Sequence, residues 1–191
     1  MHALARPRRR RLAGVAALAA AVVGSAALAA TAALAATATA GHAAASIARP
    51  CTAAQTQVWL GDGLGGGTAG TVFYPLEFTN VGHRRCTLGG YPGAVAYSAS
   101  GRRLGAAAVR VAGPHHVVTL APGATAHAQL GIHDWGAICD REAPAGGLRV
   151  TAPGERSAEA ITFPFGACAR RGVLEVGPVR GGVGIPGYTT S

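Results

Sequence analysis

Lysine is absent from this 191-residue sequence, and every basic side chain other than histidine is an arginine. Large side chains are scarce as well, because aromatic residues make up 5% of the chain and methionine occurs once. A small core with few large side chains gains limited stability from burial, so covalent cross-links should matter. Sustained helical periodicity is missing beyond Cys51, which argues against a helical domain.

The N-terminal segment has the pattern of a secretion signal. Arg6 and the run from Arg8 to Arg11 precede an almost uninterrupted alanine, leucine and valine stretch from Leu12 to about Ala40. This order is typical of a signal peptide, and Ala38-Thr39-Ala40 is a small-residue cleavage motif. We therefore predict a signal peptide at residues 1–40. An uncleaved N-terminal anchor is the alternative, because the stretch is long enough to span a bilayer.

The charge that remains beyond the leader is modest. Five of the seventeen arginines lie within the leader and all eight acidic residues lie beyond it, which leaves a net charge of about +4. Several arginines come in scattered pairs, at 84–85, 102–103 and 170–171. Such pairs do not form the concentrated basic surface of a nucleic-acid-binding protein. We interpret them as solvated turns and expect no nucleic-acid partner.

Four cysteines lie beyond the leader: Cys51, Cys86, Cys139 and Cys168. An even number outside the cytoplasm is typical of disulfides. Of the three pairings we favour Cys51–Cys86 and Cys139–Cys168, whose separate loops of about thirty residues would each stabilise the fold by roughly 3 to 4 kcal/mol. Zinc is disfavoured because no CxxC pair and no paired histidine spacing occur. We predict no metal and no other cofactor.

Short segments that alternate between apolar and polar residues predict strands, and Pro-Gly pairs mark several of the turns between them. Pro75 cannot donate to a ladder, so its strand should lie at a sheet edge or carry a bulge. In the clearest segment Ala126, Ala128, Leu130 and Ile132 should face the core, whereas Thr125, His127 and Gln129 should face outward. The predicted strands are 55–60, 72–79, 94–98, 104–111, 117–120, 124–132, 148–151, 158–163 and 173–176.

Eight or nine short strands over about 130 residues predict an all-β fold, an antiparallel β-sandwich of immunoglobulin-like character. A barrel is the alternative. The predicted organisation is a signal peptide at 1–40, a linker at 41–50, the disulfide-stapled domain at 51–181, and a flexible tail rich in glycine and proline at 182–191.

Several motifs carry a resemblance to a known family: Cys51, the segment PLEFTNVG from Pro75, the segment CTLGGYPG from Cys86, LAPG from Leu120, and the late Cys139 and Cys168. The chain from Cys51 to about Val179 resembles the domain-of-unknown-function 4232 family of exported actinobacterial proteins and lipoproteins. The resemblance implies a secreted or envelope-attached β-sandwich of uncharacterised function, and it carries over no catalytic residues. Many relatives have a lipid-anchored cysteine before the domain. This chain departs from them, because Arg49 and Pro50 precede Cys51.

The segment GDGLGG from Gly61 to Gly66 satisfies the GxGxxG dinucleotide pattern. A dinucleotide fold requires a helix directly after this pattern and an acid about twenty residues further on. Neither is present, since the chain enters the strand at Val72 and no acid occurs between Glu77 and Asp134. We interpret the segment as a flexible hairpin loop whose length could serve a binding surface.

Histidines and one tryptophan supply the candidate site. His127 and His133 lie six residues apart on one predicted strand, roughly 20 Å, which is too far to share a metal. A loop-built site could combine His115 or His116 with His133 and Asp134. Trp135, next to Asp134, is a ligand anchor if exposed and a lid over the Cys139 disulfide if buried. We predict a ligand surface made of His133, Asp134 and Trp135.

No serine lies in a nucleophile elbow, and no acid stands at a recognised spacing from a histidine, so we expect no enzymatic activity. The sequence predicts a secreted, extracytoplasmic, non-enzymatic binding or envelope-associated module whose partner is an envelope glycan or protein. Membrane contact is expected only if the leader is retained. The alternative is a secreted metal-dependent or hydrolytic enzyme that uses the region of His115, His133 and Asp134.

Overall fold

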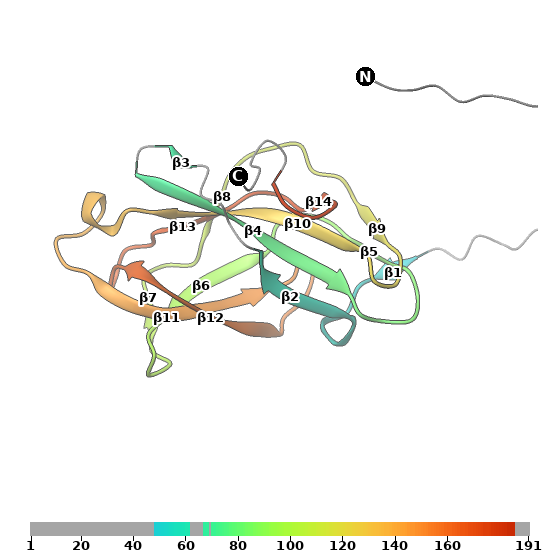
Figure 1. The fold of residues 1–191 in the computed structure, drawn as a ribbon, viewed down its shortest axis with the longest axis horizontal. Coiled ribbons are helices and arrows are strands. Elements are labelled where there is room, and N and C mark those ends of the chain that lie inside the picture. The colour runs from blue at the N-terminus through green and yellow to red at the C-terminus, as the bar shows by residue number, and fades with distance from the viewer. Residues whose placement is uncertain (1–47, 62–66, 69, 186–191) are drawn as a thin grey trace, which may run out of the picture. The chain divides into compact units, whose positions relative to one another are not determined.

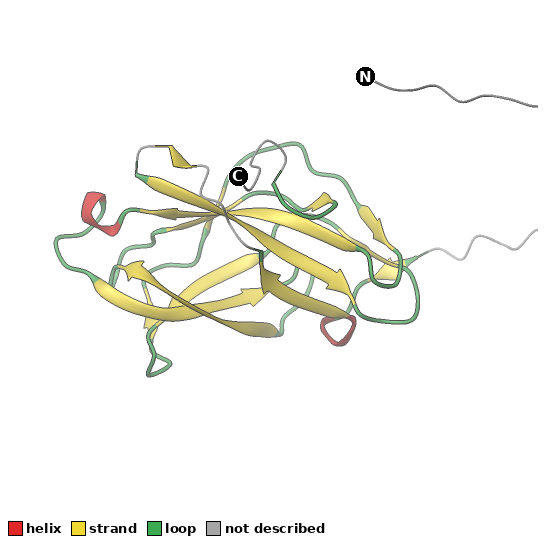
Figure 2. Cartoon of the chain, in the orientation of Figure 1, coloured by secondary structure: helices red, strands yellow, loops and turns green. Residues whose placement is uncertain are grey.

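The computed structural model describes residues 48–61, 67–68 and 70–185. The predicted signal peptide, most of the predicted linker, the core of the GxGxxG segment and residues 186–191 lie outside this range. The described residues form an all-β domain whose helical content is limited to two short 3-10 turns, Ala53–Gln55 and Trp135–Ala137, drawn red in Figure 2. Within the described residues, no helix is long and apolar enough to cross a membrane.

Two sheets form the body of the domain, with β4, β10 and β13 in one layer and β6, β11 and β12 in the other (Figure 1). The larger sheet has the order β2-β4-β10-β13-β8, with β3 added to β4 and β14 added to β10. Its strands are β2 (Thr56–Leu60), β3 (Gly67–Thr68), β4 (Thr71–Asn80), β8 (Val109–Arg110), β10 (Thr125–His133), β13 (Leu174–Val176) and β14 (Arg180–Gly181).

The second sheet has the order β12-β11-β6-β7, and a small third sheet has the order β1-β5-β9. The second consists of β6 (Gly93–Tyr97), β7 (Arg103–Leu104), β11 (Ala143–Thr151) and β12 (Ala158–Ala167), and the third of β1 (Arg49–Pro50), β5 (Cys86–Leu88) and β9 (Val118–Leu120).

The core lies between the two large sheets, where alternating side chains of both face each other. Tyr74 of β4 meets Phe163 of β12 edge to face, with ring centroids 5.0 Å apart. Leu76 and Phe78 of β4 are fully buried. The predicted inward set on β10 is confirmed, because Ala126, Ala128, Leu130 and Ile132 are all buried. The period-2 alternation of these strands therefore decides which face packs.

Two of the predicted details of the sheets are wrong. The larger sheet is not wholly antiparallel, since β13 pairs parallel with β8, and β1 likewise pairs parallel with β5 in the third sheet. The single strand predicted at 104–111 is divided, because β7 pairs with β6 in one sheet and β8 with β13 in the other. Alternation carries no information on strand direction, and these two-residue strands are too short for a pattern.

Pro75 also differs from its prediction. Its strand is not at an edge, because β4 pairs with β2 on one side and with β10 on the other. The nitrogen of Gly61 donates to the carbonyl oxygen of Pro75 at 2.8 Å, just beyond the last residue of β2. Since the nitrogen and the carbonyl of a strand residue point to the same side, the proline nitrogen faces the place where β2 has ended. Proline is tolerated there because no regular ladder bond is lost.

Both predicted disulfides are confirmed. Cys51 is bonded to Cys86 with 4.8 Å between the Cα atoms, and Cys139 is bonded to Cys168 with 6.1 Å between them. The first ties β1 to β5, which are also paired as strands. The second joins the loop after the Trp135–Ala137 turn to the end of β12. Two disulfides are typical of a protein that folds in an oxidising compartment.

Candidate functional site

The face of the larger sheet that is turned away from the core, here called the outer face, carries an unusual set of polar side chains. In β4 it presents Thr71, Glu77 and Thr79, which alternate with the buried core residues. In β10 it presents His127 and Gln129, again between core residues. An outer sheet face normally meets solvent, yet Glu77 is 0% and His127 3% exposed. Another part of the chain must therefore cover this face.

The cover is the segment Gly182–Ile185, here called the C-terminal strap. It follows β14, which pairs with β10 through Arg180 opposite His127. The strap begins with Gly182, whose nitrogen donates to the Thr125 carbonyl and whose own carbonyl oxygen lies 2.9 Å from His127 Nδ1. Gly184 N then donates to Glu77 Oε1 at 2.7 Å. Gly182 and Gly184, both within the segment predicted as a flexible tail, are thus hydrogen-bonded to β10 and β4.

The turn of the strap depends on glycine backbones. Gly182 has a φ of +93° and Gly184 a φ of +76°, a region that residues with a side chain seldom adopt. The alternation of these two glycines with Val183 allows the chain to leave β10 and return over β4. The Gly-rich composition that suggests a mobile tail is therefore also what lets this segment form a fixed turn.

Glu77 is the most deeply buried acid on the outer face. Its Oε1 accepts the bond from the strap, but no described residue hydrogen-bonds its Oε2, which is itself buried. Burial raises the pKa of the Glu77 carboxyl above its ordinary value of 4.5, although the Gly184 hydrogen bond and the attraction of His127 act in the opposite direction. The carboxyl group therefore holds a proton to a higher pH than an exposed glutamate does.

A cavity of about 450 Å³ lies between the outer face, the strap and the loop after β8. Its polar wall has four groups of different chemistry: the His127 imidazole, the Gln129 amide, the Glu175 carboxylate and the Arg180 guanidinium. Apolar groups complete it, namely Phe73, Val111, Pro178 and Ile185. Its size and its mixture of apolar walls with a few polar groups are typical of pockets for small ligands.

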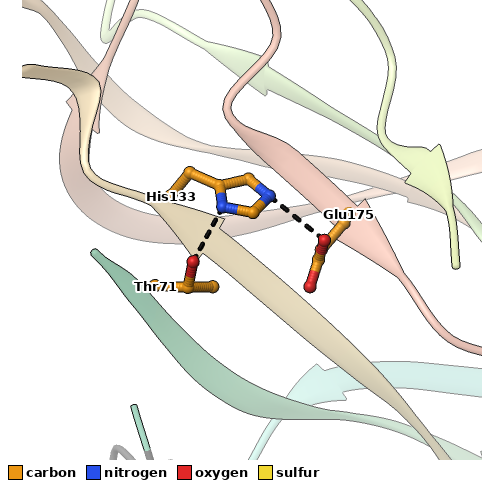
Figure 3. Close-up of polar contacts among 3 residues, drawn as sticks. All are labelled: Thr71, His133 and Glu175. Carbon is orange, nitrogen blue, oxygen red and sulfur yellow. Dashed lines mark hydrogen bonds and ion pairs between the residues drawn. The ribbon is translucent and has the colours of Figure 1, made fainter. Parts of the chain in front are cut away.

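Glu175 also belongs to a hydrogen-bonded chain across three strands (Figure 3). Its Oε2 lies 3.1 Å from His133 Nε2, and His133 Nδ1 lies 2.8 Å from the Thr71 hydroxyl oxygen. A carboxylate accepts only, so Nε2 carries the proton and donates to Glu175. With a neutral ring, Nδ1 then accepts from the Thr71 hydroxyl. The chain fixes the Glu175 carboxylate at the rim of the cavity.

Gly131 makes room for this carboxylate. It lies opposite Glu175 in the pairing of β10 with β13. A Cβ at position 131 would lie only 2.5 Å from Glu175 Cγ, so any larger residue would displace the glutamate. The glycine lets the Glu175 side chain lie flat across β10 and reach His133.

The residues that the sequence predicts as one ligand surface are divided by the structure. His133 joins the chain just described, with its side chain 35% exposed. Asp134 instead caps the following 3-10 turn by accepting from Gly136 N. Trp135 packs against Gly166, where a Cβ would collide with its ring. Its carbonyl accepts from Cys139 N, so Trp135 covers the end of β12 near the second disulfide rather than lining the cavity.

The loop-built site of the alternative enzyme is not assembled. His115 lies in the loop before β9, where its Nδ1 is 3.4 Å from the Gly113 carbonyl and its ring contacts Tyr91. It makes no contact with His133 or Asp134 in the described structure. No three histidine, cysteine or acidic side chains within the described ranges are grouped closely enough to hold a metal ion.

Sequence reasoning missed Glu77, Glu175 and Arg180 as site residues. The signal available was the alternation itself, because Glu77 and Glu175 stand between apolar neighbours at outward positions of their strands. What the alternation could not provide is the lateral order of β4, β10 and β13, which brings these side chains onto one surface.

Comparisons with known proteins give one match. The family described as "Domain of unknown function (DUF4232)" matches residues 51–180, which include both disulfides and every strand from β2 to β13. No curated protein and no solved structure matches the chain.

Proposed function

We propose that this chain, which belongs to the Domain of unknown function (DUF4232) family, is an exported, non-enzymatic binding module whose ligand occupies the cavity on the outer face. The observation that carries the proposal is the polar wall of that cavity. The core of the domain is complete without His127, Gln129 and Glu175, so a buried imidazole beside a half-buried amide and a half-buried carboxylate calls for another explanation. The N-terminal pattern and the two disulfides support export. They also support an extracytoplasmic location. The packing of two sheets around one core supports an immunoglobulin-like sandwich, a fold class often used for binding.

The wall groups indicate the ligand class. Glu175 accepts hydrogen bonds, Arg180 donates them, and Gln129 does both. The apolar side chains give one face of the ligand a surface to pack on. About 450 Å³ fits a molecule of the size of a mono- or disaccharide or a short peptide end. We therefore infer a small polar ligand, derived from an envelope glycan or protein, that offers both a donor and an acceptor.

The test is a ligand screen by NMR on the purified protein, with wall monosaccharides and disaccharides, amino acids and short peptides. We expect shifts at Gln129, Glu175 and Arg180 on titration with one of these classes. Gln129→Ala and Glu175→Gln should each weaken binding about tenfold or more, because a buried ligand group then loses its partner. Gln57→Ala is the matched control, since Gln57 is exposed on β2, away from the cavity.

The proposal fails if no member of these classes shifts cavity resonances. It also fails if Gln129→Ala, Glu175→Gln and Gln57→Ala bind the ligand equally well.

A hydrolase is the second candidate, because a hydroxyl, an imidazole and a carboxylate are joined in sequence in Thr71, His133 and Glu175. This order allows His133 Nδ1 to take the hydroxyl proton while Thr71 Oγ1 bonds to the carbonyl carbon of an ester. His133 then passes that proton to the alcohol that leaves when the ester C–O bond breaks, and water releases the acyl group from Thr71 in a second step of the same kind. In this arrangement the nucleophile would be Thr71 and not a serine. The carboxylate is that of Glu175, and neither His115 nor Asp134 of the enzyme predicted from the sequence takes part. Binding is favoured over hydrolysis since Thr71 does not line the cavity. Turnover of activated esters that is lost in Thr71→Val would reverse this preference.

A further inference from the structure

A second concave surface lies far along the sequence from the cavity residues, at the start of the described chain. It is a groove of about 1070 Å³ whose lining includes Arg49, Arg84 and Arg85, here called the arginine groove. All three side chains are exposed. Thr52 and Gln55 add polar groups to the same wall. The fold thus brings Arg49 next to Arg84 and Arg85, which are far from it in the sequence.

The backbone that carries these arginines is held from two directions. Arg49 pairs with Cys86 between β1 and β5, and the Cys51–Cys86 disulfide locks the same two segments together. On the other side, Asn80 is 0% exposed and its Nδ2 donates to the Arg84 carbonyl at 2.9 Å. The backbone positions from which the three exposed side chains extend are therefore fixed before any ligand arrives.

Among the described residues, no acidic side chain lies within ion-pair distance of Arg49, Arg84 or Arg85. The sequence between Glu77 and Asp134 contains no acid, and that interval includes Arg84 and Arg85. Three uncompensated guanidinium groups along one groove form a site for an anion, and the planar guanidinium favours phosphate through paired hydrogen bonds.

We propose that the arginine groove binds a linear polymer with repeating phosphate groups, of the polyol phosphate type. A concave surface suits a chain better than a lipid plane. A membrane site would also need large apolar anchors, whereas Pro50 and the nearby exposed Val81 are small. Nucleic acid is a poorer occupant, because none of the described residues that line the groove is aromatic and able to stack on bases. This function is separate from that of the outer-face cavity.

The experiment measures fluorescence anisotropy of a labelled poly(glycerol phosphate) titrated with the purified protein. Three phosphate contacts should make the affinity fall roughly 20-fold between 50 and 200 mM salt, if each contact contributes as in single-stranded nucleic acids. The variant Arg49→Gln/Arg84→Gln/Arg85→Gln should lose at least tenfold in affinity and most of the salt dependence. Lysine at the same three positions should restore only part, because it keeps the charge and lacks the planar fork.

The matched control removes the same charge elsewhere. Arg102→Gln/Arg156→Gln/Arg170→Gln changes three exposed arginines outside the groove and should bind like the unmodified protein. Equal losses in both triple variants would reduce the effect to net charge and overturn the proposal. So would an absence of polymer binding, a preference for phosphatidylglycerol vesicles, or tighter binding of single-stranded DNA.

Discussion

At the scale of single residues, the environment of the Glu77 carboxyl group is one that stability alone does not favour. Its carboxyl is fully buried, one oxygen has no partner among the described residues, and burial raises its pKa. A buried unpartnered acceptor normally destabilises a fold. The Gly184 bond and the proximity of His127 offset part of that cost. Glu77 is therefore the group through which we expect protonation of the outer face to affect the C-terminal strap.

Glu77→Gln should remove a pH dependence of stability. Because the folded-state pKa is raised, the folded protein binds more protons than the unfolded chain, so the free energy of unfolding falls as the pH rises from about 4.5 toward the raised pKa. The glutamine keeps an acceptor for Gly184 N and cannot ionise. Denaturant unfolding between pH 4 and pH 8 should show a flatter profile and higher stability at pH 8. Glu142→Gln, at an exposed position, should keep the original profile.

If the free energy of unfolding of Glu77→Gln kept the original slope against pH, the Glu77 carboxyl group would have to be hydrated in the folded protein. It would then not link the strap to pH.

At the scale of elements, the strap decides how much of the larger sheet is open. It continues from β14 along β10 and then crosses to β4, so that both β10 and β4 contribute to its contacts. Ile185 of the strap lines the cavity, which makes the strap one wall of the proposed ligand site. Its two glycines with positive φ can be substituted to test this role of the strap.

Gly184→Val should displace the strap. Valine at a φ of +76° costs about 1 to 2 kcal/mol, which the folded chain can avoid by breaking the bond to Glu77. We expect faster hydrogen exchange in the peptide that spans residues 180–185, weaker ligand binding, and the same flattened pH profile as in Glu77→Gln. Gly101→Val is matched, because Gly101 has a φ of +79° and open space around its Cβ position in another turn. If both variants left the exchange of 180–185 unchanged, the strap would not depend on Gly184.

At the scale of the whole molecule, the two disulfides hold different parts of the domain together. Cys51–Cys86 closes 35 residues and holds β1 against β5, next to the arginine groove. Cys139–Cys168 closes 29 residues at the end of β12, near Trp135. In the chain-entropy model each loop stabilises the fold by about 4 kcal/mol, a large share of what a domain of this size has.

Cys51→Ser/Cys86→Ser and Cys139→Ser/Cys168→Ser should therefore lose similar stability and differ in function. Each should lower the free energy of unfolding by about 4 kcal/mol in urea titrations. Only the first should also weaken polymer binding, because Arg49 is then held next to Arg84 by two strand residues alone. Under conditions where both variants remain folded, equal polymer affinity would show that the disulfide does not organise the arginine groove.

The sequence by itself determined the all-β class and the inward face of β10, and it favoured the observed disulfide pairing among three possible ones. These follow from local information: alternation selects a face, and the order of the four cysteines favours two separate loops. Only the tertiary structure decided which strands are neighbours. That choice placed Pro75 inside a sheet, buried His127 under the strap and joined Glu175 to His133. It also packed Trp135 against Gly166 and brought Arg49 to the Arg84–Arg85 pair. Contacts between segments that are far apart in the chain depend on the packing of the whole core, and no local pattern specifies them.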